Sequence, residues 1–126
     1  MERMNKEELI NLVESLGIDF EEFWLLSSSA LVMRDLFPSA GDLDIAVTEK
    51  GLEELKSKYE IINTHDNWYK VTDNIECVLD TKDDYKVVKY GKYNLQSLEA
   101  YRDWLLTSDR EKDKERLEIV EKALGK

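Results

Sequence analysis

Hydrophobic and polar residues follow helical spacing in some parts of the chain and strand-like spacing in others. Leu9, Leu12, Val13 and Leu16 recur three or four residues apart and are followed by Gly17, a common helix stop. Elsewhere short apolar runs lie between turn residues, which is typical of strands. The pattern predicts helices over 6–16, 29–36, 50–59, 95–106 and 109–124. It predicts strands over 23–26, 43–47, 59–64, 68–72, 75–79 and 85–90.

This order of elements indicates an α/β protein. Helices and short strands are mixed, and the strands do not alternate strictly, as expected for a sheet covered by helices. We therefore expect a mixed β-sheet covered by helices, with two helices at the C-terminal end. The 126 residues suit one domain with its own core, and no repeat, linker or low-complexity segment divides them. We expect a single domain over residues 1–126.

Two aspartates lie close together at the strand predicted over 43–47. Successive residues of a strand point to opposite faces, so Asp42 and Asp44 share one face and Leu43 and Ile45 the other. Carboxylates about 7 Å apart along a strand can both reach a pair of divalent ions. Oxygen ligands suit Mg²⁺ or Mn²⁺ better than zinc. The alternative is a half-exposed strand that shows two aspartates to water.

Three serines stand where the first predicted strand ends and the next helix begins. Helix N-termini present free N–H groups and partial positive charge, and small residues let a phosphate approach them. Ser27 and Ser28 are therefore candidate nucleotide-binding residues. The alternative is a plain N-cap, in which a serine hydroxyl satisfies the first turn of the helix. Pro38 and Gly41 mark the loop that returns the chain to the aspartates.

These two segments together resemble the nucleotidyltransferase superfamily, which includes polymerase beta, kanamycin-type nucleotidyltransferases and small minimal nucleotidyltransferases. The family pattern is Gly-Gly or Gly-Ser at the start of a helix, roughly a dozen residues, and then Asp-hydrophobic-Asp/Glu-hydrophobic on the next strand. Here the match is Ser27-Ser28 with Asp42-Leu43-Asp44-Ile45, and Ser27 stands in place of the family's first glycine. The resemblance extends over about residues 17–124 and implies a nucleotidyltransferase-type sheet.

The resemblance also implies a third carboxylate on a later strand, facing the first two. In the strand predicted over 75–79, Glu76 and Val78 share a face with Asp80, which follows the strand. Similarity to the family's hydrophobic-acid-hydrophobic pattern selects Glu76, with Asp80 as the alternative. By this resemblance Asp42, Asp44 and Glu76 are the catalytic and metal-binding residues.

A second, weaker resemblance lies near the C-terminus. Arg110-Glu111-Lys112-Asp113 looks like the Arg-x-Lys-Asp segment with which many small members of the superfamily begin their last helix. The resemblance implies that Lys112 and Asp113 lie close to the nucleotide, with Lys112 binding it. The alternative is that Ser108 and Glu111 form a capping box and that the charged residues make the solvated face of a helix. We favour this alternative.

Charge and composition narrow the range of partners. The net charge is −10, from 28 acidic and 18 basic residues, so a duplex nucleic acid, which needs a basic surface, is not expected. A small neutral or cationic acceptor, or a protein partner, fits this charge better. No apolar run approaches the length of a membrane span, and residues 1–8 lack the apolar core of a signal peptide. We expect a cytoplasmic protein that does not bind membranes.

Other residues with suggestive chemistry are assigned to packing or turns. Four aromatic residues could stack on a base or an acceptor ring: Trp68, Tyr69, Tyr90 and Tyr93. Such residues more often pack a sheet against helices, so we assign none of them to a base, and we expect Trp104 in the core. Cys77, the single cysteine, is expected to be buried. His65, the only histidine, lies in an apparent turn, so nothing supports a Ser-His or zinc site.

Two hypotheses of different kinds follow from these observations. In the first, the chain is a metal-dependent nucleotidyltransferase that moves a nucleoside monophosphate from an NTP to a hydroxyl of a small acceptor. Its cofactor is then Mg²⁺ or Mn²⁺. In the second, the chain is a nucleotidyltransferase-fold module that binds a protein partner, as antitoxin-like members of the superfamily do, with little or no activity of its own. The retained acids favour the first hypothesis, and the small size of the chain favours the second.

Overall fold

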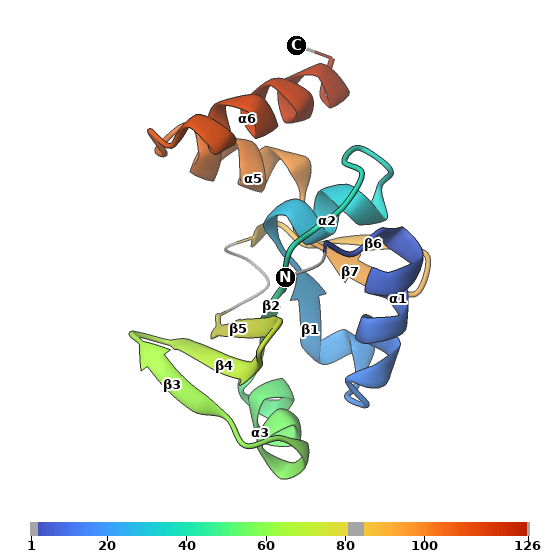
Figure 1. Ribbon diagram of the computed structural model, residues 1–126, viewed down its shortest axis with the longest axis vertical. Coiled ribbons are helices and arrows are strands. Elements are labelled where there is room, and N and C mark those ends of the chain that lie inside the picture. The colour runs from blue at the N-terminus through green and yellow to red at the C-terminus, as the bar shows by residue number, and fades with distance from the viewer. Residues whose placement is uncertain (1–2, 81–84, 126) are drawn as a thin grey trace.

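The computed structural model describes residues 3–80 and 85–125, which form an α/β fold, as the sequence predicts (Figure 1). The helices are α1 (Lys6–Ser15), α2 (Ser27–Met33), α3 (Glu49–Lys58), α5 (Leu98–Leu105) and α6 (Glu111–Ala123), with a 3₁₀ turn, η1, at Phe20–Glu22. The strands are β1 (Phe23–Leu25), β2 (Leu43–Val47), β3 (Ile62–His65), β4 (Trp68–Thr72), β5 (Ile75–Leu79), β6 (Val88–Tyr90) and β7 (Tyr93–Leu95). None of the helices in the described ranges has the length and apolar character needed to cross a membrane.

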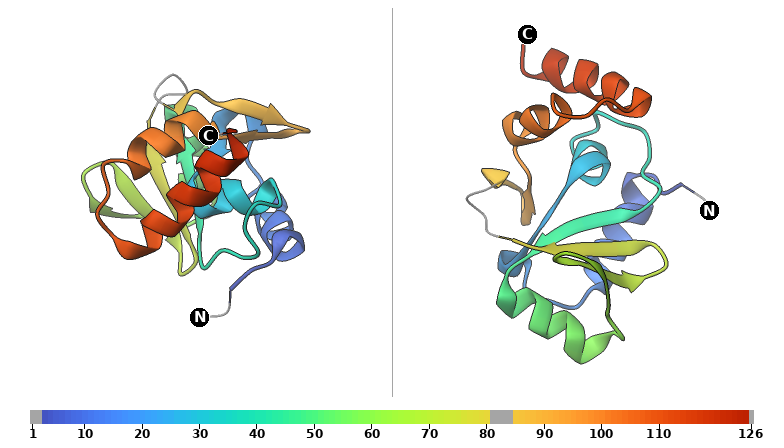
Figure 2. Two further views of the ribbon diagram at one scale, coloured as in Figure 1. Left: turned by 90° about the horizontal axis from the view of Figure 1, so that it is seen from above. Right: turned by 90° about the vertical axis from the view of Figure 1, so that its left-hand side faces the viewer.

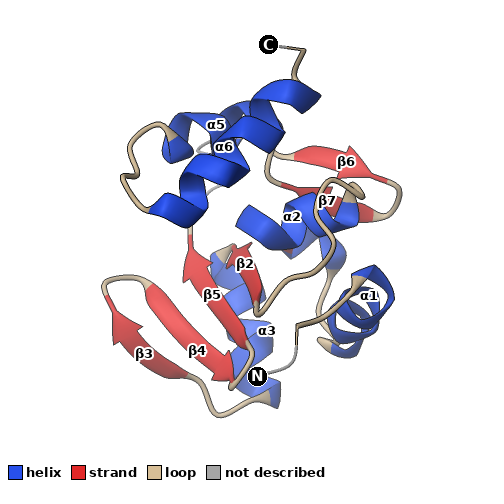
Figure 3. Cartoon of the chain, turned by 45° about the horizontal axis from the view of Figure 1, so that its top comes forward, coloured by secondary structure: helices blue, strands red, loops and turns tan. Residues whose placement is uncertain are grey.

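The strands form one mixed sheet in the order β3-β4-β5-β2-β1-β7-β6 (Figure 3). At its centre β2 and β5 run parallel, with Asp44 directly opposite Glu76, and β1 runs antiparallel to β2. A parallel pair requires a crossover connection, which α3 and the β3-β4 hairpin supply here. Both acids are therefore the second residue of their strand and lie at the same end of two neighbouring strands.

One face of the sheet carries the main core. Leu43, Ile45 and Val47 of β2 are fully buried on this face, as strand alternation predicts. The helices α1 and α3 pack against them through apolar residues at helical spacing: Leu9, Val13 and Leu16 from α1 with the following residue, and Leu52 and Leu55 from α3. Figure 1 shows the two helices beside and below β1 and β2. The other face of β2 thus carries the two aspartates.

The helices α5 and α6 form a pair that packs on α2. Leu31 of α2, Tyr101 and Leu105 of α5 and Val120 of α6 are buried together. In Figure 2 the pair lies at one end of the molecule, with α2 between it and the strands and α3 at the opposite end. The two C-terminal helices expected from the sequence are therefore present, and they pack against α2.

The end of α2 differs from the sequence prediction, which continued the helix to residue 36. The helix ends at Met33 because Asp35 takes a positive φ of 61°. The N–H of Leu36 then donates to the carbonyl of Leu31 (3.0 Å), and that of Asp35 to Val32 (3.0 Å). These two bonds make a Schellman motif, which normally has glycine where this chain has Asp35. Without that glycine the first stop signal in the sequence was Pro38, so the predicted helix ran beyond Met33.

The region after residue 85 also differs from the prediction of one strand over 85–90 and a helix from residue 95. Two short strands, β6 and β7, form a hairpin, and the turn between them contains Gly91 with a φ of 64°. The helix α5 begins only at Leu98, where the Ser97 hydroxyl accepts a hydrogen bond from the N–H of Ala100 (3.1 Å). Asn94 and Gln96 are buried near the end of this hairpin. Because these buried residues are polar, the hydrophobic pattern of the sequence does not indicate a strand here.

Candidate functional site

The three predicted acids come from two neighbouring strands and lie on one face of the sheet. Asp42 immediately precedes β2, and Asp44 on β2 pairs in register with Glu76 on β5. Asp80 follows the far end of β5, where its N–H donates to the carbonyl of Val47 (3.1 Å). Of the two alternatives for the third acid, the structure therefore places Glu76, rather than Asp80, beside Asp44.

The environment of Asp44 disfavours its ionised form. Burial, together with the nearby negative charges of Glu76 and Asp42, raises the pKa of this carboxyl to about 6, although the positive charges of Arg116 and Lys112 act against this rise. The positive charges near Asp44 thus do not offset the combined effect of burial and the neighbouring acids. Such a cluster of like charges is typical of sites that bind a cation.

Ser27 and Ser28 begin α2 next to this cluster. The N-cap residue of α2 is Leu26, and no side chain caps the helix, so the interpretation of a serine as a plain N-cap is wrong. Ser27 instead takes a φ of 53°, in the left-handed region that favours glycine, and its N–H donates to the side-chain oxygen of Gln96 (3.1 Å). The backbone at Ser27 therefore has the conformation expected where the family pattern has glycine.

Ser29, which sequence analysis left without a role, connects α2 to the acidic strand. Its hydroxyl is completely buried, donates to the carbonyl oxygen of Asp42 (3.1 Å) and accepts from the N–H of Asp44 (3.3 Å). One side chain thus fixes the backbone on both sides of Leu43, between the two aspartates. A signal was available in the sequence, since a hydroxyl residue inside an apolar helix needs a hydrogen-bond partner.

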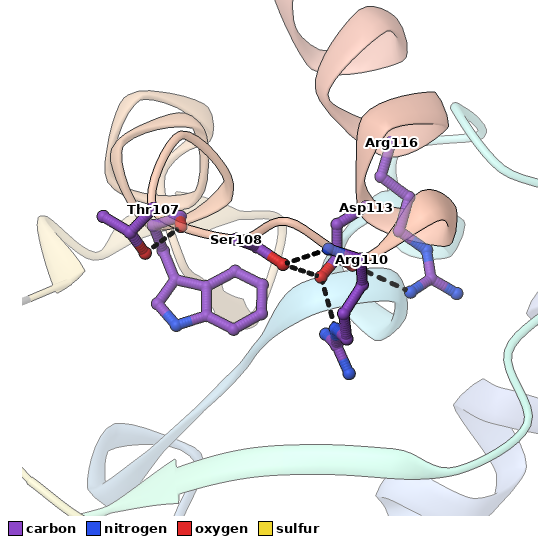
Figure 4. Close-up of polar contacts among 6 residues, drawn as sticks. Thr107, Ser108, Arg110, Asp113 and Arg116 are labelled. Atoms are coloured by element: carbon purple, nitrogen blue, oxygen red, sulfur yellow. Dashed lines mark hydrogen bonds and ion pairs between the residues drawn. The ribbon is translucent and has the colours of Figure 1, made fainter.

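Asp113 lies at the start of α6 and is buried, with 1% of its side chain exposed. The Ser108 hydroxyl and Arg110 Nε both donate to its Oδ2 at 2.6 Å, and Arg116 Nη1 lies 3.5 Å from its Oδ1 (Figure 4). Burial alone would raise the pKa of Asp113, but the hydrogen bonds from Ser108 and Arg110 and the charges of Arg110 and Arg116 hold it below its usual value.

The capping box predicted for this segment is therefore wrong, and Asp113 is buried, whereas Glu111, Lys112 and Lys114 are exposed as expected for a solvated helix face. The N-cap of α6 is Arg110, which makes no side-chain cap bond, and the Ser108 hydroxyl is used to hold Asp113. Asp113 in turn orients the two arginines around it (Figure 4). Lys112 is exposed at the same helix start. This long-range clustering was not visible in the sequence, because it depends on how α6 packs.

A polar pocket of about 220 Å³ connects these segments. It is lined by the acids Asp42, Asp44 and Asp113, the serines Ser27 and Ser28, and the cations Arg3, Arg110, Lys112 and Arg116. Thus five of the six predicted site residues, all but Glu76, lie around one cavity. Four of the 18 basic residues gather here although the chain carries a net charge of −10. Of these four cations, only Lys112 was a predicted site residue.

Arg3 reaches this pocket from the other end of the chain. Its guanidinium donates from Nε to the hydroxyl of Ser39 and from Nη2 to the carbonyl of the same residue, both at 2.8 Å. The backbone beside it is tied down by hydrogen bonds in both directions between Met4 and Ala40. Arg3 is therefore positioned by the loop that leads to Asp42.

A second pocket of about 280 Å³ adjoins the first. It shares Ser27, Asp44, Tyr101, Trp104 and Arg110 with the polar pocket and is otherwise lined by Leu26, Trp68, Tyr85 and Gln96. Trp104 is 46% exposed, so its assignment to the core is wrong. Of the four aromatic candidates from the sequence, only Trp68 lines this cavity. Tyr93, for example, packs edge-on against Phe20 and donates to Glu14 Oε1 (2.8 Å).

Other reactive side chains do not take part in this site. Burial raises the pKa of Cys77 to about 12, so its thiol stays protonated and unreactive, and it is buried as expected. His65 is exposed at the β3-β4 turn and stacks on Trp68. Within residues 3–80 and 85–125, no three His, Cys, Asp or Glu side chains are arranged so that they could hold a metal ion by themselves.

Comparisons of the chain with family models, curated proteins and solved structures find no match. The functional assignment therefore depends on the geometry and chemistry of this chain.

Proposed function

We propose that the chain is a metal-dependent nucleotidyltransferase that moves a nucleoside monophosphate from an NTP to a hydroxyl of an acceptor. One observation carries the proposal: a cluster of acids from two parallel strands lies at the edge of a pocket that collects four cations. Acids alone would suit a cation and cations alone an anion. The combination suits a polyphosphate that enters together with a divalent metal.

The cations of the pocket are suited to the phosphates. Arg110 and Arg116 are oriented by Asp113, and Arg3 is oriented by Ser39, so three guanidinium groups are held before any ligand arrives. Preorganised arginines bind phosphate oxygens with two N–H donors each and lose little entropy in doing so. Lys112 adds a fourth positive charge. Ser27 and Ser28 line the same cavity and offer hydroxyl donors.

The donor set fits Mg²⁺ or Mn²⁺. Asp42, Asp44 and Glu76 offer only carboxylate oxygens, and Mg²⁺ is usually held by one or two carboxylates together with substrate phosphates rather than by a complete protein cage. An incomplete protein ligand set is therefore what this function requires. When bound, the metal supplies Lewis-acid polarisation of the phosphoryl oxygens.

The remaining chemistry is proton transfer and positioning. In the proposed reaction the acceptor oxygen forms a bond to the α-phosphorus, the bond from that phosphorus to the bridging oxygen breaks, and pyrophosphate leaves with the electron pair. Glu76 is the candidate base for the proton of the acceptor hydroxyl, because it lies beside Asp44 and is exposed to an incoming molecule. Ser29 holds the backbone between the two aspartates in place.

The alternative of a protein-binding module without activity has less support. Large hydrophobic residues that are exposed in the described ranges are Ile62, Val88, Tyr90, Trp104 and Leu106. Ile62 and the pair Val88 and Tyr90 lie on β3 and β6, at opposite edges of the sheet, so they do not form one continuous surface. An interface for a folded partner normally has a contiguous apolar centre.

Thermal melting with metal and nucleotide tests the proposal. Millimolar Mn²⁺ with a nucleoside triphosphate should raise the melting temperature of the parent protein, because both bind only the folded state. The shift should disappear in Asp44→Asn and persist in Asp80→Asn, which changes an acid at the far end of β5. A parent protein that shows no shift, or a shift that survives intact in Asp44→Asn, would contradict the proposal.

A further inference from the structure

We infer, on the basis of the proposed function, that the second pocket holds the base of the nucleotide, stacked against Trp104. This pocket adjoins the polar one at Asp44 and is lined mainly by aromatic and aliphatic side chains. Aromatic surfaces bind flat uncharged rings and gain little from phosphates. The two pockets therefore suit two chemically different parts of a ligand.

The lining of this pocket comes from segments far apart in the chain. Leu26 follows β1, Trp68 begins β4, and Tyr85 packs with Trp24 at 5.7 Å between ring centroids. Trp104 on α5 also lines this pocket. Its ring is nearly parallel to that of Tyr101, with centroids 6.2 Å apart and an angle of 18°. The guanidinium of Arg110 lies over the same Trp104 ring, 5.5 Å from its centroid, and 46% of the residue is exposed, so a base would stack on the exposed part of the ring beside Arg110.

Tyr101 provides an independent indication that a ligand atom belongs here. The residue is 2% exposed and lines both pockets, yet its hydroxyl has no hydrogen-bond partner within residues 3–80 and 85–125. A buried hydroxyl without a partner is costly, and native structures rarely contain one. A polar ligand atom at the junction of the two pockets would satisfy it.

A nucleoside triphosphate matches both pockets as one molecule. It has a charged chain for the four cations of the polar pocket and an uncharged flat ring for the aromatic pocket. The sugar and α-phosphate then lie between them, where Asp44 and Tyr101 line both cavities. A ring-bearing acceptor would explain the aromatic pocket alone, whereas the nucleotide explains both pockets and their shared wall.

Isothermal titration with two ligands, each with Mn²⁺, tests this inference. A nucleoside triphosphate occupies both pockets, and inorganic tripolyphosphate occupies only the polar one. We expect the parent protein to bind the nucleotide more tightly than tripolyphosphate. In Trp104→Ala the affinity for the nucleotide should fall by roughly tenfold, because stacking is lost, while that for tripolyphosphate should fall much less, since Trp104 also lines the polar pocket beside Arg110. The matched control is Tyr90→Ala, which removes an equally exposed aromatic residue on β6 and should change neither affinity.

Tyr101→Phe adds a variant that keeps the ring and the fold. It should weaken nucleotide binding several-fold without lowering the melting temperature of the free protein, since it removes a hydroxyl that lacks a protein partner. If the parent binds both ligands and Trp104→Ala leaves nucleotide affinity unchanged, the base lies elsewhere and the inference is overturned, while the proposed function stands. If the parent binds neither ligand, the proposed function fails and the inference fails with it.

Discussion

In the metal-free protein, the surroundings of Asp44 disfavour the ionised form of its carboxyl group. Its pKa of about 6 lies above the 3.8 of an ordinary aspartate, so between these values the folded chain binds more protons than the unfolded chain. The free energy of unfolding therefore decreases as the pH rises from about 4 to 6 and stays lower above that range. Functional sites commonly lower the stability of the folded protein in this way.

Asp44→Asn should remove this cost. We expect the variant to be more stable than the parent at pH 7, by at most about 3 kcal/mol for a shift of about two pKa units, and the difference to vanish near pH 4. Thermal melts of the metal-free protein from pH 4 to 8 measure it. Asp42→Asn is the neighbouring control and should leave stability unchanged or slightly higher. A large loss of stability in both variants would mean that the acids are structural.

Ser27 carries a backbone conformation that suits glycine better. Ser27→Gly should be neutral or stabilising by up to about 1 kcal/mol, because relief of the positive φ of 53° offsets the greater entropy of glycine in the unfolded chain. Ser28→Gly is the matched control: it changes the next residue, which has no positive φ, and should destabilise by about 1 kcal/mol. Chemical denaturation of both variants measures the difference. Equal losses would show that Ser27 is not strained.

At the scale of elements, the start of α6 is organised around a buried carboxylate. Asp113 accepts two short hydrogen bonds and holds Arg110 and Arg116, so the helix pair α5-α6 carries the cations of the polar pocket in a fixed arrangement. The pKa of Asp113 is lowered, in contrast to that of Asp44. Its ionised form therefore stabilises the fold at neutral pH, and this contribution is lost as the pH falls through the lowered pKa.

Asp113→Asn should destabilise the protein by about 1–3 kcal/mol at pH 7, because hydrogen bonds to a charged group are lost. The difference from the parent should shrink in acid, the opposite trend to that of the Asp44 variant. Asp109→Asn, at an exposed position of the same segment, is the control and should have almost no effect. Urea titrations at several pH values check this, and equal effects of the two variants would contradict a structural role for Asp113.

The elements also show which parts of the fold were predictable. The bounds of β2, β4 and β5 agree with the sequence prediction, because their apolar residues are local and turn residues bracket them. The hairpin of β6 and β7 was missed because Asn94 and Gln96 interrupt its apolar pattern. The pairing of Asp44 with Glu76 was expected only by resemblance, since strand register depends on contacts between distant segments.

At the scale of the whole molecule, charge is distributed unevenly. The chain is strongly acidic, but four cations from residues 3 and 110–116 meet at one pocket. Neither Arg3 nor the segment 110–116 indicates by itself that these cations meet at one pocket. Arg3 is isolated in the sequence, and the C-terminal cluster looks like an ordinary solvated helix until its packing on α2 is known. Asp42 and Asp44 were therefore found from local spacing and Glu76 by resemblance, whereas most of the cations of the site were not found.

The most direct test of the proposed function is a crystal structure with Mn²⁺ and a nucleoside triphosphate whose α–β bridging oxygen is replaced by a methylene group. The account predicts an anomalous manganese peak between Asp42 and Asp44, the phosphates among Arg3, Arg110 and Arg116, and the base against Trp104. A manganese peak away from both aspartates, or crystals that take up neither metal nor nucleotide at saturating concentration, would contradict it.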